Sequence, residues 1–120
     1  MSLWNRLQRQ EAIVHAPQLW SYEVTSILHK HTFDKTLTVA EVEAALDVIF
    51  DLRVTLVEEH KSLCLAAFRC ANRLKQRAAY DGFYVALAES LNADFWTADQ
   101  GLCNNARDLG VNWVHFIAEA

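Results

Sequence analysis

The chain has 120 residues, a formal net charge of −4, 52% hydrophobic and 22% charged residues, and only three glycines and one proline. These proportions are typical of one folded domain and exclude a disordered or low-complexity chain. No apolar run approaches the roughly 18 residues that cross a bilayer, and residues 1–11 lack the apolar centre of a signal peptide. We therefore expect a single cytoplasmic domain over residues 1–120 with no membrane segment. We expect its three cysteines, Cys64, Cys70 and Cys103, to be reduced and mostly buried.

The first half of the chain begins with the pattern of a helix end and then alternates β-prone and helical stretches. Pro17 follows a short β-prone run and is typical of a helix start. Thr38 and Glu41 have the spacing of a capping box, which marks the start of another helix. In chain order we expect a strand at 12–15, a helix from 19 to about 30, a loop at 31–37 and a helix from 39 to about 50.

The second half continues the alternation. In chain order we expect a strand at 53–57, a helix with its apolar stripe at Leu63, Ala67, Cys70, Ala71 and Leu74, a helix from about 79, a strand at 93–98, a helix at 100–109 ended by Gly110, and a strand at 111–117. Strands that alternate with helices of 10 to 15 residues predict an α/β fold: a mostly parallel sheet flanked by helices. Ligands of such sheets bind at the carboxyl ends of the strands.

Three acidic residues stand at positions where this fold could bring them together. Glu23 lies within an apolar helical stripe, where a carboxylate needs a partner; a structural ion pair or a solvated edge would also explain it. Asp81 and Asp99 begin helices, where acids are common as caps. Carboxylates within about 4–6 Å of one another favour a bound cation. Oxygen ligands without spaced Cys or His favour Mg²⁺ or Mn²⁺ over zinc.

The segments around these acids, LWSYEV at 19–24, AYDGFYVALA at 79–88 and WTAD at 96–99, resemble the three acidic motifs of the PIN-domain family. The likeness is greatest to the VapC-type toxin ribonucleases of toxin–antitoxin pairs. In order and spacing it extends from about Ala12 to Ile117. YDGFYVALAESLNADFWTAD is the most specific block.

The resemblance implies a three-layer PIN-like fold and a metal-dependent endoribonuclease, a hydrolase that acts on RNA. It implies that Glu23, Asp81 and Asp99 hold Mg²⁺ or Mn²⁺ and that the Thr97 hydroxyl orients a ligand or water. Carboxylate-held Mg²⁺ would polarise a phosphate oxygen and lower the pKa of bound water. The partners implied are an RNA substrate and a small antitoxin protein.

The sequence departs from the family in one respect. The family has a further aspartate at the end of its first, central strand, whereas no Asp precedes Asp34 here. The pattern therefore lacks its N-terminal strand, and we expect weak metal binding and weak cleavage. The strands expected at 12–15 and 93–98 would flank the missing strand, so either they pair directly or a second copy covers their unpaired edges; we favour the homodimer. The alternative function is a non-catalytic, PIN-derived protein-interaction domain.

A basic segment is hidden by the acidic net charge. No acid occurs between His60 and Tyr80, while five of the 11 lysines and arginines do. Arg69, Arg73 and Arg77 follow at intervals of four, which predicts a basic stripe on a helix. We expect contact with RNA phosphates; an ordinary solvated helix face is the other interpretation.

Overall fold

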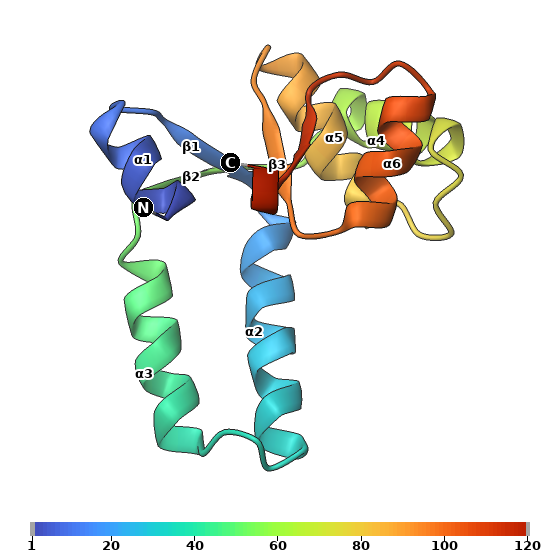
Figure 1. Cartoon of the computed structure of the whole chain (residues 1–120). Helices are drawn as coiled ribbons and strands as arrows, with labels where there is room; N and C mark the ends of the chain where they lie inside the picture. The colour runs from blue at the N-terminus through green and yellow to red at the C-terminus, as the bar shows by residue number, and fades with distance from the viewer. Residues whose placement is uncertain (1, 120) are drawn as a thin grey trace. The chain divides into compact units, whose positions relative to one another are not determined.

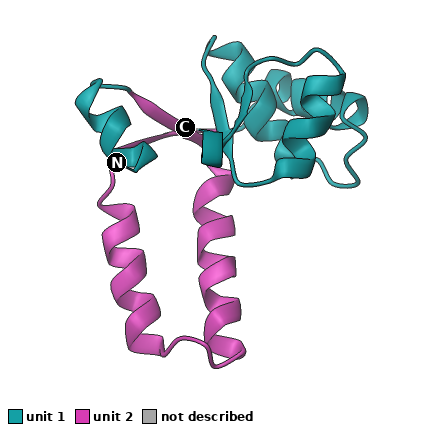
Figure 2. Cartoon of the chain, viewed as in Figure 1, with its two compact units in different colours: residues 1–12, 59–120 teal, residues 13–58 magenta. Residues whose placement is uncertain are grey.

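The structure, a computed structural model, describes residues 2–119. Within these residues it contains six α-helices and four short strands, an α/β fold in which all strand pairs are parallel (Figure 1). The chain divides into two compact units, unit 1 with residues 1–12 and 59–120 and unit 2 with residues 13–58 (Figure 2). A search of the described helices finds none of the length and apolarity that a bilayer span requires.

The first and last elements of unit 2 are two strands that pair with each other in parallel. β1 (Val14–Pro17) pairs with β2 (Val54–Val57), with Val14 opposite Val54 and Pro17 opposite Val57. Pro17 therefore ends a strand, where we had expected it to begin a helix. A proline is tolerated at this position because only alternate residues of a strand donate to one neighbour: the Gln18 amide donates to the Val57 carbonyl at 2.9 Å, so the pairing needs no N–H at Pro17.

Two helices lie between these strands and form a hairpin. α2 (Leu19–Phe33) extends beyond the end expected at Lys30, and α3 (Val39–Phe50) begins at the expected capping box. The Thr38 hydroxyl accepts from the Glu41 amide at 3.1 Å, and the Glu41 carboxylate accepts from the Thr38 amide at 3.0 Å. These hydrogen bonds lower the pKa of Glu41.

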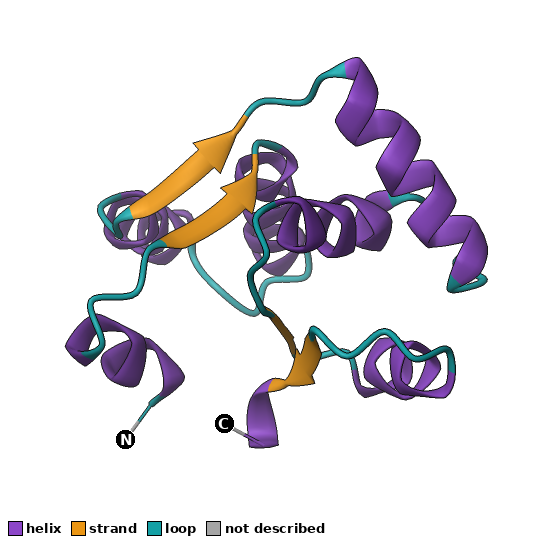
Figure 3. Cartoon of the chain, turned by 90° about the horizontal axis from the view of Figure 1, so that it is seen from above, coloured by secondary structure: helices purple, strands orange, loops and turns teal. Residues whose placement is uncertain are grey.

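Unit 1 contains the second strand pair and the remaining helices. β3 (Phe95–Thr97) pairs in parallel with β4 (Val114–Phe116). Figure 3 draws the strands in orange. The helices are α1 (Leu3–Arg9), α4 (Lys61–Arg73), α5 (Tyr80–Ser90) and α6 (Gln100–Asp108), and a 3₁₀ turn spans Ile117–Glu119. The described strands thus form two two-stranded sheets, β1–β2 and β3–β4.

The cluster of buried hydrophobic residues lies in unit 1. Its buried members come from α4, α5, α6 and the segment before β4: Leu74, Val85, Leu102, Ala106 and Val111. The Trp113 indole packs against this cluster and donates its N–H to the Val85 carbonyl at 3.1 Å. The apolar stripe expected on α4 is confirmed, because Leu63, Ala67 and Ala71 are buried along it.

Helices α4 and α5 approach each other closely at Gly82. A Cβ atom at this position would overlap the Ala67 carbonyl oxygen of α4 and lie 3.2 Å from the Ala71 Cβ. Gly82 therefore permits a helix contact that any side chain would prevent.

Candidate functional site

The chain turns sharply from β3 into α6, and two polar side chains hold that turn. The Thr97 hydroxyl oxygen accepts from the Asp99 amide at 3.1 Å, and the Asp99 Oδ1 accepts from the Leu102 amide at 3.0 Å. Asp99 is thus the N-cap of α6, in agreement with the capping interpretation. A cap of this kind uses one oxygen of a carboxylate that has two, each with two lone pairs.

Asp81 lies in the first turn of α5, the helix before β3. Residues 91–94 join α5 to β3. The Tyr84 ring of α5 stacks on the Phe95 ring of β3, with centroids 5.5 Å apart. Asp81 stands three residues before Tyr84 in α5, and Thr97 stands two residues after Phe95 in β3. Side chains three residues apart on a helix share a face, so Asp81 lies on the face of α5 that presents Tyr84.

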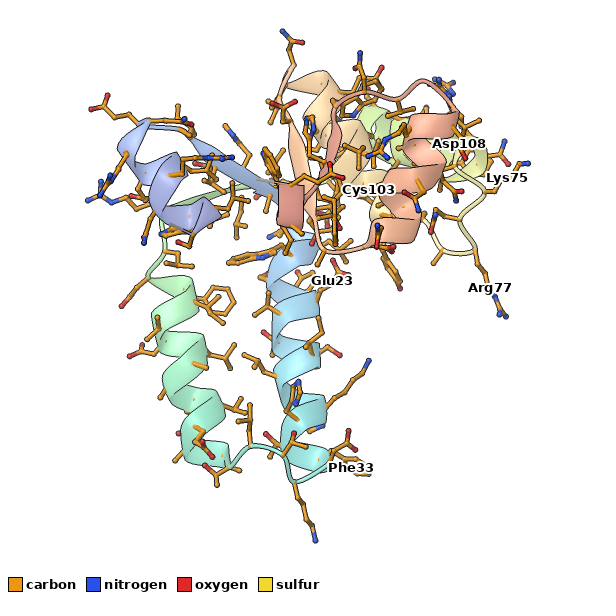
Figure 4. The ribbon with its side chains drawn as sticks, viewed as in Figure 1. Glu23, Phe33, Lys75, Arg77, Cys103 and Asp108 are labelled. Carbon is orange, nitrogen blue, oxygen red and sulfur yellow. The ribbon has the colours of Figure 1, made fainter. Side chains whose placement is uncertain are left out.

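Glu23 lies on α2 in unit 2 and is half-buried (Figure 4). The apolar stripe expected around it is not buried, because α2 has no buried residue and Ile27 is exposed. Trp20 of the same helix packs edge-on against Phe50 of α3, with ring centroids 5.6 Å apart. Asp81 and Asp99 belong to unit 1, whereas Glu23 belongs to unit 2. The convergence of the three acids therefore stays a prediction. Among residues 2–119, no group of three or more His, Cys, Asp or Glu side chains is close enough to hold a metal ion.

The chemistry of the unit 1 residues fits Mg²⁺ or Mn²⁺. Asp81 and Asp99 offer carboxylate oxygens, and Thr97 offers a hydroxyl whose oxygen already faces the Asp99 backbone. The Thr97 O–H proton can donate to a water or a carboxylate, which is the orienting role that the resemblance implies.

A second cluster of polar and aromatic side chains, on the β3–β4 sheet, was not predicted from the sequence. Trp96 and His115 are register partners, and their rings are 4.9 Å apart. The His115 Nε2 lies 2.9 Å from the Asp94 Oδ1, and the Arg6 guanidinium lies 5.7 Å from the Trp96 ring centroid. Side chains alternate along a strand, so Trp96 faces away from Phe95 and Thr97. Only the strand register reveals this cluster, and the sequence alone does not provide the register.

The basic segment differs from its predicted form. α4 ends at Arg73, and Lys75 has a positive φ of 56°, so Arg77 lies in the following turn rather than on the helix. Figure 4 shows the Lys75 and Arg77 side chains extending outward from this turn. The helical stripe therefore contains only Arg69 and Arg73. The Arg73 guanidinium also donates to the Leu109 carbonyl at 2.9 Å, which caps the carboxyl end of α6.

The cysteines differ in their surroundings. Cys103 on α6 is buried, Cys70 is half-buried and Cys64 is exposed, contrary to the expectation that it packs inside. Burial raises the pKa of the Cys70 and Cys103 thiols, and nearby Glu89 and Glu119, respectively, raise them further. Both remain protonated thiols near neutral pH, which is the state of an inert packing residue.

No protein-family model matches the chain, and no curated protein matches it.

Proposed function

We propose that the chain is a PIN-like, Mg²⁺- or Mn²⁺-dependent endoribonuclease, the toxin of a toxin–antitoxin pair. The main support is the arrangement at the end of β3. Thr97 and Asp99 stand at the carboxyl end of β3, where α/β folds bind ligands, and Asp81 lies in the first turn of the preceding helix α5. The motif resemblance adds Glu23 as a further acid. A continuous three-layer fold and a cytoplasmic location belong to the same proposal.

Each residue would have a defined part in the reaction. Glu23, Asp81 and Asp99 would hold the ion, which polarises the scissile phosphate and lowers the pKa of a bound water. Thr97 would orient that water through its O–H. Because the sequence matches three acids where the family has four, we expect weak ion binding and slow cleavage.

The test is RNA cleavage by the purified chain with Mn²⁺ or Mg²⁺ at millimolar concentration. Asp99→Asn keeps a good N-cap, because asparagine caps helices as well as aspartate does, but removes the charge that binds the ion. We expect Asp99→Asn to lower the cleavage rate about a hundredfold, equivalent to about 2.7 kcal/mol in the barrier.

The matched control is Asp108→Asn, at the opposite end of α6, where the side chain is exposed. This variant should cleave like the natural chain. Equal rates for Asp99→Asn and the natural chain, or cleavage that persists in excess EDTA, would rule out the proposed metal site.

A second candidate, a non-catalytic interaction domain, is favoured by the surface of unit 2. Within the described residues, α2 has no buried side chain and α3 buries only Val42. Large apolar side chains that remain exposed include Tyr22, Ile27, Val48 and Phe50. Patches of this kind mark sites of association.

The character of this surface suggests the partner. A groove along α3 is lined by Ala40, Glu43, Ala44, Leu46, Asp47 and Phe50, so apolar side chains and two acids share it. Unit 2 carries seven acids against three lysines and arginines, a net charge of −4 that equals that of the whole chain. A small antitoxin protein with a basic, apolar segment would complement this surface. The homodimer is the other association that we propose, although facing copies of Glu43 and Asp47 would repel each other.

Sedimentation velocity separates these candidates. If the chain self-associates, Phe50→Glu abolishes that association and the chain does not cleave RNA, the interaction domain is favoured over the enzyme. Metal-dependent cleavage by a monomer would favour the enzyme.

A further inference from the structure

The outer face of α4 carries an aromatic ring among positive charges. The side chain of Phe68 is 63% exposed, although phenylalanine is ordinarily buried. It lies about 100° around the helix axis from the buried stripe of Leu63, Ala67 and Ala71, and it is not part of the core cluster of unit 1.

The charged residues near Phe68 in the sequence are of one sign. Lys61 lies two turns before it on the same face, and Arg69 is next to it in the chain; both are exposed. Exposed Lys75 and Arg77 follow in the turn after α4. No acid occurs between His60 and Tyr80, so this segment is positive within a chain whose net charge is negative.

We infer that Phe68 is a base-stacking residue on which single-stranded RNA rests while Lys61 and Arg69 contact its phosphates. This inference rests on the proposed function, for which it specifies how the substrate is held. Single-stranded nucleic acids are bound by positive surfaces that display aromatic side chains, since every base has a face that can stack. The positive charge complements a polyanion, whereas the core of a protein–protein interface is depleted of charge.

The geometry favours a single strand over a duplex. The bases of an A-form helix are stacked on one another, and its major groove is too deep and narrow for side chains to read. A ring on the convex face of a helix can reach a base only where that base is unpaired.

The test measures the affinity of the full chain for two labelled oligomers in EDTA, so that no cleavage takes place. One is a 12-nucleotide uridine RNA and the other an abasic ribose-phosphate of equal length and charge. We expect Phe68→Ala to weaken binding of the uridine RNA about fivefold or more and to leave binding of the abasic oligomer unchanged. Phe68→Leu should behave like Phe68→Ala, because it retains the apolar surface without the ring.

Two matched variants complete the design. Phe33→Ala removes a ring that is 79% exposed in unit 2, beside Asp34, and should leave both affinities unchanged. Arg69→Gln should weaken binding of both oligomers and reduce the slope of log affinity against log salt by about 0.7, the value for one phosphate contact to a single strand.

Unchanged affinity of Phe68→Ala for the uridine RNA would overturn the inference. The same holds if Phe68→Ala instead alters the sedimentation coefficient of the free chain, because Phe68 would then be a protein contact. Binding that depends on Phe68 in a chain that never cleaves RNA would support the inference and overturn the proposed ribonuclease.

Discussion

Gly82 is the residue at which one added methyl group should matter most. The added Cβ would overlap the Ala67 carbonyl, a backbone atom that moves only if α4 and α5 separate. Overpacking of this kind costs about 1–3 kcal/mol, partly offset by the better helix propensity of alanine. We expect Gly82→Ala to lower the denaturant midpoint of unit 1.

Gly101→Ala is the matched comparison for this prediction. The nearest atom to its Cβ would be the Asp99 Oδ1 at 3.3 Å, the end of a side chain that can adjust. Gly101→Ala should therefore keep or raise the midpoint. If both alanine variants unfold at the same denaturant concentration, the close approach of α4 and α5 at Gly82 does not affect the free energy of unfolding.

The structural roles of residues near the proposed site could be predicted where a local sequence rule applies. Asp99 follows a β-prone run and precedes a helix, so both its cap and its place at a strand end follow from sequence. The pairing of His115 with Asp94 and Trp96 depends on the register between strands 19 residues apart in the chain, Phe95 opposite Val114. No local pattern fixes that register.

At the scale of the elements, Arg73 joins two helices of unit 1. Its guanidinium donates to the Leu109 carbonyl, which belongs to the otherwise unsatisfied end of α6, and a positive charge there also favours the helix dipole. We expect Arg73→Gln to destabilise the chain by about 0.5–1.5 kcal/mol. Arg69→Gln, one turn earlier, should leave stability unchanged. Thermal unfolding of the two variants checks this difference, and equal melting temperatures would show that the cap is unimportant.

The helices were predicted better than the limits of the strands. The capping box at Thr38, the apolar stripe of α4 and the glycine after α6, Gly110 with a φ of 74°, each correspond to a local physical cause. The strands are three or four residues long; the ranges expected for β2, β3 and β4 were longer, and the range expected for β1 had the right length but began two residues too early. Strand length is set by partners distant in the chain, and here each strand has one pairing partner. The end of α4 was also missed, because no proline or glycine marks it.

For the molecule as a whole, the distribution of buried side chains predicts unequal stability. Unit 1 contains the core cluster, with Leu102 and Val85 each 1% exposed. In unit 2, α2 and α3 bury one residue, Val42. Segments with few buried apolar contacts open locally at low free-energy cost. We expect amide hydrogens of α2 and α3 to exchange at least about tenfold faster than those of α5 and α6, a difference of about 1.4 kcal/mol in opening free energy.

Binding of a partner or of a second copy should reduce this difference in exchange rate between the helices of the two units. Anything that binds the exposed apolar side chains of unit 2 removes them from water, and it stabilises the state to which it binds. Raising the protein concentration, or adding a protein that binds unit 2, should slow exchange in α2 and α3 and leave α5 and α6 unchanged. Leu102→Ala is the control: loss of a buried leucine costs about 2–5 kcal/mol, so exchange should accelerate through α5 and α6 at every protein concentration. Equal protection of the two units in the dilute chain would show that α2 and α3 need no partner to be stable.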